Sequence, residues 1–372
     1  MDFDFTALSR WPDVEAENLY AADAADRLLL DEAATDLTAA SPGSVVVIGD
    51  GYGALTLGAA AMHGVRGIRT HQDPLSGERA LAANAERFGL SDAHVALGLD
   101  EPLLSGARVV LLRLPRSLDA LDEIAEAIAR WARPDVRVFA GGMVKHMTTA
   151  MNDVLRRHFG RVDVTHARQK ARVLIAVDPV RPDASAWPRT RVDAETGLTI
   201  VAHGAAFAGP AVDIGTRFLL AHLDDARPGA ARAIDLGCGT GVLAVELARR
   251  RGIPVLATDQ SAAAVASARA TAAANGVAEL VEVVRDDALG GEPDASADLI
   301  VLNPPFHIGA TVHPGIARKL FADAGRALAP GGELRAVWNS HLRYRPALER
   351  LVGPTREIAR NPTFTVTASV RT

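Results

Sequence analysis

The chain has 372 residues, of which 48% are hydrophobic and 23% charged, and a typical size of about 150 residues per domain predicts two domains. It contains no apolar run of about 18 residues, and its acidic N-terminus lacks the order of a signal peptide. The composition therefore predicts a cytoplasmic protein with no membrane segment. The one cysteine, Cys238, excludes a disulfide framework and a cysteine-based zinc site.

The net charge of −5 conceals an uneven distribution of charge along the chain. Residues 1–40 carry ten acidic side chains against two arginines, whereas residues 131–172 carry nine basic side chains against three acidic ones. Residues 335–372 carry seven arginines against two acids. Arginine binds phosphate bidentately and stacks on bases, so both basic stretches are candidate RNA contacts. Solvated, arginine-rich faces are the alternative interpretation.

The hydrophobic periodicity of the first half predicts alternating strands and helices. The expected strands are 44–48, 67–70, 94–97, 108–112 and 136–140, and the expected helices are 54–63, 77–88 and 118–131. A glycine turn at 49–53 joins the first strand to the first helix. This order is typical of an α/β fold with a parallel sheet covered on both faces.

The second half repeats the same series of elements. The expected strands are 232–236, 254–258, 280–284, 299–302 and 333–338, and the expected helices are 242–251, 262–275 and 315–328. Matching positions lie 186 to 190 residues apart, as Gly49 and Gly237 do. We therefore expect two tandem doubly wound Rossmann-like domains, 1–180 and 190–372, joined by the proline-containing segment 178–191.

Acidic side chains follow three successive strands of the second half. Asp235 precedes the glycine turn 237–241, Asp259 ends the next strand, and Asp286 and Asp287 follow the third. Open parallel sheets bind ligands at this edge, and glycine lets a ligand approach the backbone closely. The three positions suit the amino-acid part, the ribose diol and the adenine amine of S-adenosylmethionine better than a dinucleotide. Each acid taken alone is equally well explained as a helix cap or a solvated loop residue.

The segment Asn303-Pro304-Pro305-Phe306 follows the fourth strand. An exocyclic amine is a poor nucleophile, and its lone pair must point at the methyl group for transfer. The Asn303 side-chain oxygen and the Pro304 carbonyl can accept its two N–H groups, which is positioning rather than proton abstraction. Two prolines stiffen the loop, and Phe306 offers a face on which a flipped base can stack.

Together with His307, this segment resembles the NPPFH motif of class I methyltransferases that act on N2 of guanine in ribosomal RNA. The whole chain resembles their two-domain bacterial form, over about residues 40–372, and 45–57 and 110–115 are more similar to the large-subunit type than to the small-subunit type. Further similar stretches are 213–218, 275–276, 332–334 and 339–344.

The resemblance implies an enzyme that uses S-adenosylmethionine, without a metal, on ribosomal RNA or a ribosomal subunit precursor. Alignment with the family favours Asp287 over Asp286 at the adenine. The implied catalytic residues are Asn303, Pro304 and Phe306, and the implied cofactor-binding residues are Asp235, Gly237, Gly239, Asp259, Asp287 and Asn303.

The first half lacks this set of residues. Arg113 stands where the second half has Asn303, no acid ends the strand before the glycine turn, and Tyr52 occupies space that a cofactor would need. We expect a degenerate first domain that recognises RNA through residues 131–172. One departure concerns the second half, where Phe207-Ala208-Gly209 replaces the family's Phe-Ser-Arg.

Three other functions stay open from the sequence. The Asn-Pro-Pro arrangement also serves methylation of another planar amine or amide, such as adenine N6 or a protein glutamine, although those relatives more often carry tyrosine where Phe306 stands. A non-catalytic ribosome-assembly factor is a second alternative, against which intact Asp235, Asp259 and Asn303 argue. The third is a nicotinamide dehydrogenase, and nothing at Asn303 suits hydride transfer. A monomer is the expected oligomeric state.

Overall fold

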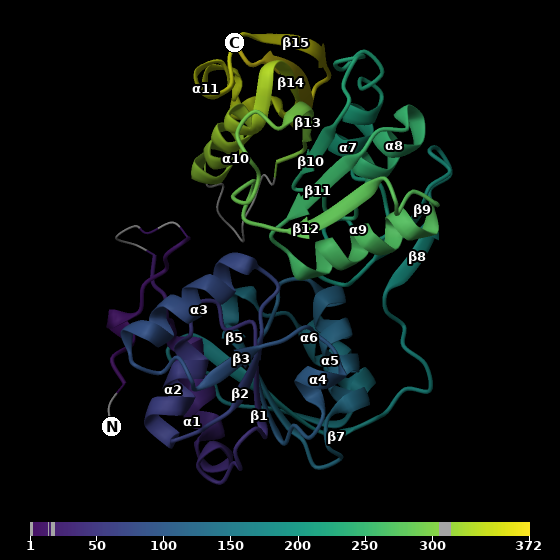
Figure 1. Ribbon diagram of the computed structural model, residues 1–372. Coiled ribbons are helices and arrows are strands. Elements are labelled where there is room, and N and C mark those ends of the chain that lie inside the picture. The colour runs from purple at the N-terminus through teal and green to yellow at the C-terminus, as the bar shows by residue number, and fades with distance from the viewer. Residues whose placement is uncertain (1–2, 14, 16–18, 305–313) are drawn as a thin grey trace. The chain divides into compact units, whose positions relative to one another are not determined.

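The computed structural model describes all residues except 1–2, 14, 16–18 and 305–313, and the chain forms two compact units (Figure 1). The units are Met1–Trp187 and Pro188–Thr372. The division falls inside the segment 178–191 that the sequence indicates as a linker. Each unit has its own sheet and its own hydrophobic core.

The first unit contains a seven-stranded sheet with the order β3-β2-β1-β4-β5-β7-β6. Its strands are β1 (Val45–Ile48), β2 (Ile68–His71), β3 (His94–Ala96), β4 (Val109–Arg113), β5 (Arg137–Met143), β6 (Phe159–Val164) and β7 (Ala171–Pro179). Its helices are η1 (Phe5–Ala7), α1 (Ala24–Thr38), α2 (Ala54–His63), α3 (Leu75–Arg87), α4 (Glu101–Leu104), α5 (Leu118–Trp131), η2 (Val144–His146) and α6 (Thr149–His158).

The second unit repeats this order as β12-β11-β10-β13-β14-β16-β15 and adds the two-stranded sheet β8-β9. Its strands are β8 (Arg189–Val192), β9 (Thr199–Ala202), β10 (Ala233–Leu236), β11 (Val255–Asp259), β12 (Val281–Arg285), β13 (Ala297–Leu302), β14 (Leu328–Asn339), β15 (Thr355–Arg360) and β16 (Phe364–Val370). Its helices are α7 (Ile214–Leu220), α8 (Val242–Arg251), α9 (Ala262–Ala274), α10 (Pro314–Ala327), η3 (Ser340–Leu342) and α11 (Arg345–Leu351).

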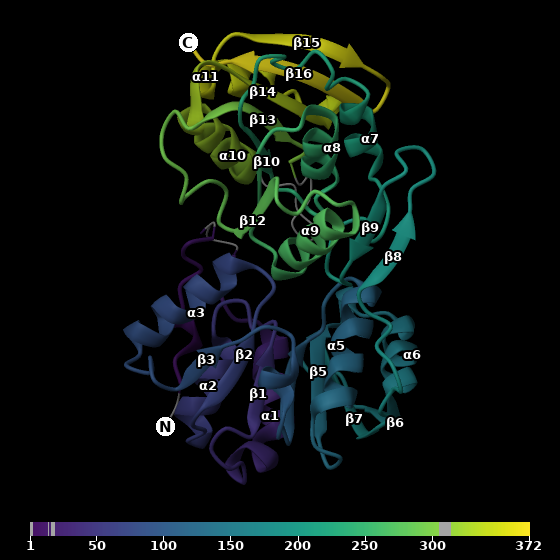
Figure 2. The ribbon, with the colours of Figure 1, turned by 45° about the vertical axis from the view of Figure 1, so that its right-hand side comes forward.

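The first five strands of each sheet are parallel, as the sequence predicts, and the edge strands β6 and β15 run in the same direction, but one strand of each sheet is reversed. Strand β7 is antiparallel to β5 and β6, and β16 is antiparallel to β14 and β15 (Figure 2). The expectation of a wholly parallel sheet is therefore wrong at this edge. The sequence of β16 alternates apolar residues with Thr365, Thr367 and Ser369. These polar side chains are buried and hydrogen-bonded to η3, β14 and β15 respectively.

The central strands are buried on both faces because they are short runs of aliphatic residues. Val46 and Ile48 of β1 pack in one cluster with α5, whereas Val45 and Val47 pack in the other with α1 and α2. In the second unit, one cluster includes α8 and α9 and the other includes α10 and α11. Both sheets therefore carry helices on both faces, which leaves the loops at the strand ends for a site.

Among the described residues, no helix combines the length and the apolar character that a membrane crossing requires.

Candidate active site

The glycine turn of the second unit connects β10 to α8 and turns sharply at three left-handed positions. Gly237, Gly239 and Gly241 have φ of 72°, 54° and 79°. A Cβ built on Gly237 or Gly239 would meet no described atom within 4 Å, so open space lies beside the turn. A Cβ on Gly241 would lie 2.9 Å from Ala268 Cβ, so this glycine lets α8 and α9 approach. The turn thus combines close helix packing with a face that a ligand can reach.

Asp235 lies inside β10 and is fully buried. Its Oδ2 accepts a hydrogen bond of 3.0 Å from the backbone N–H of Ala244, in the first turn of α8, and its Oδ1 has no hydrogen-bond partner among the described residues. Burial raises the pKa of Asp235 to about 7. The carboxyl group therefore supports the start of α8 and keeps one oxygen for a further contact.

Asp259, at the end of β11, is fixed beside the same turn. Its Oδ2 accepts from the Gly239 N–H at 3.0 Å and its Oδ1 from the Ser261 N–H at 2.9 Å. The two further acids differ from each other. Asp286 accepts from backbone N–H groups of its own loop, whereas Asp287 forms a 2.5 Å ion pair with Lys319 of α10. The Asp287 carboxylate therefore contacts another element of the fold.

Asn303 directly follows β13, and Leu302 pairs in register with Leu236, so Asn303 lies beside the start of the glycine turn. Its Nδ2 donates to Asp213 Oδ2 and to Thr216 Oγ1, both at 3.0 Å. Its Oδ1 is buried and has no hydrogen-bond partner among the described residues. Pro304 is buried next to it. The predicted residues Phe306 and His307 lie outside the described residues.

The structure thus gathers Asp235, Asp259, the glycines and Asn303 at the carboxyl ends of β10, β11 and β13. The sequence reasoning gave no role to Asp213 and Thr216, which contact Asn303 from the start of α7. Asp213 belongs to a stretch that resembles the family, and an aspartate before a helix is a common cap, but its contact with a residue 90 positions away has no sequence signal.

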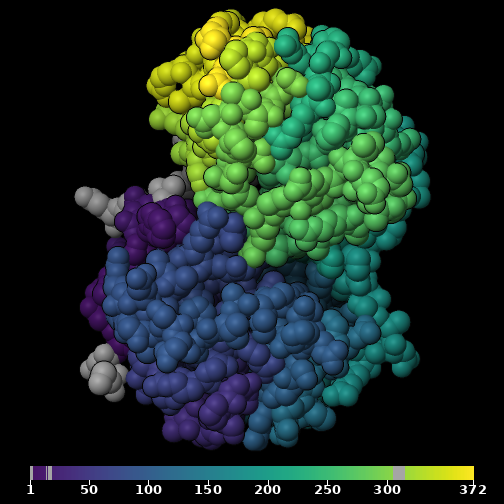
Figure 3. Space-filling model, in the orientation of Figure 1, coloured from purple at the N-terminus to yellow at the C-terminus, as the bar shows by residue number. Residues whose placement is uncertain are grey.

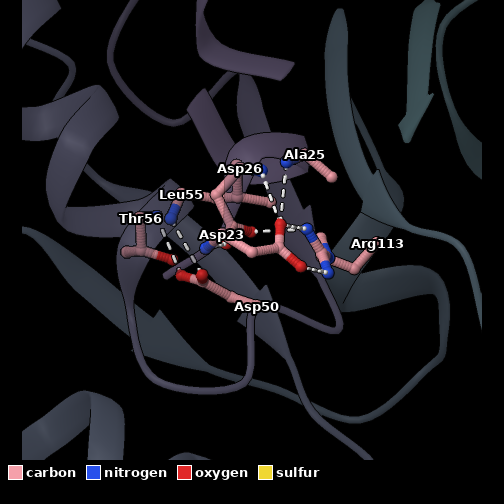
Figure 4. Close-up of polar contacts among 7 residues, drawn as sticks. All are labelled: Asp23, Ala25, Asp26, Asp50, Leu55, Thr56 and Arg113. Atoms are coloured by element: carbon pink, nitrogen blue, oxygen red, sulfur yellow. Dashed lines mark hydrogen bonds and ion pairs between the residues drawn. The ribbon is translucent and has the colours of Figure 1, made fainter. Parts of the chain in front are cut away.

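Arg113 occupies the position in the first unit that Asn303 occupies in the second. Its guanidinium donates to Asp23 at 2.8 and 3.1 Å and to Asp26 at 3.0 Å (Figure 4). The cluster contains more carboxyl groups than cations. Burial raises the pKa of Asp26 to about 7 and also raises that of Asp50. This end of the first sheet is occupied by a partly buried ion-pair cluster.

Asp50 is an acid whose role the sequence reasoning missed. The strand before the first glycine turn lacks an acid, as predicted, but Asp50 inside the turn accepts from the backbone N–H groups of Leu55 and Thr56, each at 2.8 Å. Thr56 lies 188 residues before Ala244, whose N–H Asp235 accepts. A carboxylate therefore supports the same helix start in both units, from two different positions of the chain.

The N-terminal segment covers the glycine turn of the first unit, and Figure 3 shows this segment in purple. The Tyr52 hydroxyl donates to Asp13 at 2.6 Å, and the Arg10 guanidinium lies 4.5 Å from the centre of the Tyr52 ring. Asn84 of α3 bonds the backbone of both Ser9 and Tyr52. The space beside this turn therefore holds the protein's own residues.

The raised pKa of Asp235 predicts a pH dependence of stability. Because the folded-state pKa of about 7 exceeds the ordinary value of 3.8, the stabilisation is present below about pH 4 and is lost as the pH rises through 7. In Asp235→Asn the amide oxygen can still accept from Ala244, and no titration occurs. We expect the Tm of the unchanged protein to fall relative to the variant by roughly 5 °C between pH 5 and pH 8. Parallel Tm curves would show that Asp235 titrates normally.

Comparison with known proteins agrees with this fold. Residues 197–368 match the family model described as "Methyltransferase small domain", and residues 1–181 match the "RLMG N-terminal domain". The second unit therefore carries a methyltransferase domain, and the first carries the domain that accompanies it in one family.

Relatives along the whole chain identify that family. A protein of Streptomyces coelicolor named ribosomal RNA large subunit methyltransferase G is 38% identical over 98% of this chain and 97% of its own length. One of the same name from Pseudomonas aeruginosa is 37% identical over 96% of each chain. This chain belongs to the family of ribosomal RNA large subunit methyltransferases G, which confirms the resemblance to the large-subunit type.

A solved structure confirms the two-domain fold. The T. thermophilus 16S rRNA N2 G1207 methyltransferase, in complex with AdoMet and guanosine, matches with a TM-score of 0.74 at 23% identity. The match covers 94% of this chain and 92% of that one. The duplicated α/β architecture is thus shared along both chains.

Proposed function

We propose that this chain transfers a methyl group from S-adenosylmethionine to the exocyclic N2 of a guanine in large-subunit ribosomal RNA. Family membership supports the reaction class and the large-subunit substrate. The observation that carries the proposal is the Asn303 side chain, whose oxygen is a buried acceptor without a described partner at the ligand edge of the sheet. A buried acceptor of this kind is costly unless a ligand donor meets it.

The donor site that we propose is the edge formed by the glycine turn and the acids around it. Gly237 and Gly239 leave room for the donor beside the backbone. Asp259, fixed by two backbone N–H groups, is placed to accept from ribose hydroxyls. Asp287 is the proposed adenine contact, and its ion pair with Lys319 holds it in place. Asp235 keeps one oxygen for the amino-acid part. The bound donor supplies an electrophilic methyl group.

The acceptor amine is held by Asn303 and the proline loop in this proposal. The Asn303 Oδ1 and the Pro304 carbonyl accept the two N–H groups, which directs the nitrogen lone pair out of the ring plane and toward the methyl group. Phe306 is the proposed stacking surface for the flipped guanine. No side chain has to act as a base, because the amine becomes acidic after transfer and loses its proton to water.

The first unit is the proposed RNA-recognition domain, and the ion pairs of its arginines favour a smaller surface than the whole of residues 131–172. Several basic side chains of residues 131–172 form ion pairs with carboxylates. Arg137 pairs with Asp36, and Arg168 pairs with Asp31. At the carboxyl end of the sheet, the exposed Lys145 and Lys170 form no ion pair with a described carboxylate. The Val144 N–H donates to the Lys170 carbonyl, which brings the two segments together.

Neighbouring cations strengthen this surface, which we call the lysine edge (Arg116, Lys145, His146 and Lys170). Partial burial, together with the charges of Arg116 and Lys145, lowers the pKa of His146. The contributions of the two cations to this shift indicate a positive local potential. Phosphate contacts need such a potential and carry no sequence information, so they suit a domain that positions RNA.

Charge reversal at the lysine edge tests this assignment. We expect Lys145→Glu with Lys170→Glu to weaken RNA binding at least about 10-fold and to lower the slope of log Kd against log salt by about 2. The matched control is Arg156→Glu with Arg161→Glu, because these exposed arginines already pair with Asp153 and Asp163. Equal losses for both double variants, measured by fluorescence anisotropy, would contradict a localised surface.

The overall function is tested by mapping methylated guanosines in ribosomal RNA. We expect RNA from cells lacking the protein to miss one N2-methylguanosine in the large subunit, and expression of the unchanged protein to restore it. An unchanged map would reject the proposal. A protein that binds S-adenosylmethionine but leaves the map unchanged would methylate another amine or amide, and one without donor binding would be an assembly factor.

A further inference from the structure

The orientation of the Asn303 amide decides whether it can serve as an acceptor. An amide has an oxygen that accepts and a nitrogen that donates, and the two ends are nearly the same size. The Asp213 carboxylate, when ionised, can only accept. Because Asp213 Oδ2 and Thr216 Oγ1 both lie 3.0 Å from Asn303 Nδ2, the nitrogen faces them and the oxygen faces the other way.

We propose that Asp213 and Thr216 are positioning residues that fix the Asn303 amide so that its oxygen, and not its nitrogen, meets the substrate amine. The inference rests on the proposed function of Asn303 as an acceptor. In the reversed orientation, the amide oxygen would face the Asp213 carboxylate and the amide nitrogen would face the substrate N–H groups. Both contacts would be repulsive, so one carboxylate enforces the productive orientation.

The start of helix α7 holds these two residues rigidly. Asp213 is the N-cap of α7, and its Oδ2 also accepts from the backbone N–H groups of Gly215 and Thr216, at 2.9 and 3.2 Å. A Cβ on Gly215 would lie 3.1 Å from Asp213 Oδ2 and 3.4 Å from Asn303 Nδ2. Glycine at this position therefore permits the close approach of the helix start to Asn303.

In the first unit, the equivalent contact between the helix start and the strand end is made without a side-chain acceptor. Asp23, Asp26 and Arg113 each lie 190 residues before Asp213, Thr216 and Asn303, and Asp23 is likewise the N-cap of α1. There the helix–strand contact is an ion pair, and the Arg113 side chain has donors but no acceptor. Holding the helix to the strand therefore does not require an amide. Of these two helix–strand contacts, the one in the second unit also provides a side-chain oxygen without a described partner.

The first test is Asp213→Asn, which introduces an amide that can donate as well as accept. Because the cap and the Asn303 contact use the same oxygen, Asp213 Oδ2, the introduced amide turns its nitrogen toward Asn303 only by giving up the cap. The Asn303 amide can then take either orientation. We expect kcat to fall about 10- to 100-fold at saturating donor, with donor Kd unchanged and Tm lowered by no more than the loss of one helix cap, about 2–4 °C. Thr216→Val should lower kcat in the same way. Thr216→Ser, which retains the hydroxyl, should keep the kcat of the unchanged protein. The assay uses large-subunit RNA and ribosomal subunits from cells lacking the protein.

The second test exchanges the amide of Asn303 and the carboxylate of Asp213. In Asn303→Asp a carboxylate faces the Asp213 carboxylate, so we expect little activity. In the double variant N303D with D213N, the introduced amide can turn its nitrogen toward the introduced carboxylate, at the cost of its cap contact, and the second carboxylate oxygen then serves as the acceptor. We expect the double variant to be at least 10-fold more active than N303D. A purely structural role predicts that the double variant is no better than the weaker single one.

The outcomes separate this inference from the function on which it rests. If Asn303→Ala has the same kcat as the unchanged protein, Asn303 is not the acceptor. Both its proposed role in the reaction and the positioning role of Asp213 and Thr216 are then wrong. If Asn303→Ala is inactive but D213N and Thr216→Val keep full kcat and the exchange gives no recovery, the positioning role is overturned while the acceptor role stands. A D213N variant in which Tm and donor affinity fall together with kcat would also overturn it, since this pattern would indicate that Asp213 only caps the helix.

Discussion

Replacing Asn303 with alanine is expected to lower the rate of methyl transfer by about 100- to 1,000-fold while leaving the affinity for S-adenosylmethionine unchanged. The change removes the side-chain oxygen that is buried without a described partner and leaves the Pro304 carbonyl as the remaining acceptor. The glycine turn and Asp259 are hydrogen-bonded to each other and not to Asn303, so the donor edge stays intact. Single-turnover rates at saturating donor, together with calorimetric titration of the donor, measure the two effects separately.

The control for this prediction is the helix start next to Asn303. Asp213 still accepts from the backbone N–H groups of Gly215 and Thr216 after the substitution, so α7 keeps its cap. The Tm of the variant should therefore change by no more than about 2–4 °C, which corresponds to about 1 kcal/mol. A variant that transfers methyl groups at the unchanged rate, or one that loses donor affinity as much as rate, would contradict the assigned role.

Replacing Arg113 with methionine is expected to destabilise the first unit by about 3 kcal/mol. The guanidinium is the cation that Asp23 and Asp26 share, and Asp26 is largely buried. Without it, buried carboxylates lose their partner and must be protonated or exposed. Burial already raises the pKa of Asp26 to about 7, and loss of Arg113 raises it further. The destabilisation should therefore grow as the pH rises from 5 to 8.

Hydrogen exchange measured by mass spectrometry can assign this loss to one unit. We expect faster exchange in peptides from β1, β4 and α1, and unchanged exchange in peptides from β10 and β13. The matched control is the variant that also carries Asp23→Asn and Asp26→Asn, in which removal of the charges should recover much of the loss. Unchanged exchange after Arg113→Met, or equal acceleration in both units, would disprove the role of the cluster.

The sequence predicts the parallel strands, the glycine turns and the repeat because these depend on local patterns. Helices α2, α5 and α8 begin and end where the periodicity indicates. Strand β16 has the alternation of a half-exposed strand, so the sequence does not show that its Thr and Ser side chains are buried. Their hydrogen bonds to β14, β15 and η3 make burial tolerable, and such partners are visible only in the folded chain.

The site shows the same division between local and long-range information. Asp235, Asp259 and Asn303 could be named because each lies within the last two residues of a strand or directly follows one. Asp213 and Thr216 could not be given a role, because their contact with Asn303 joins residues about 90 positions apart.

Charge runs were the weakest guide to function. Arg335 lies in the arginine-rich C-terminal stretch, yet it is fully buried and pairs with Glu333 and Asp225. Arg137 pairs with Asp36, 101 residues away. The acids that neutralise such arginines are distant in the chain, so a count along the sequence cannot distinguish a solvated cation from a paired one.

The cluster of Asp23, Asp26 and Arg113 has a consequence for any attempt to build a second site in the first unit. Replacing Arg113 with asparagine would leave two carboxylates around a neutral amide, and Asp26 would also have to become uncharged. Ala25 would have to become glycine as well, because that is the residue at the matching position of α7. The three positions are therefore coupled, and a change at Arg113 alone costs stability without reproducing the arrangement around Asn303.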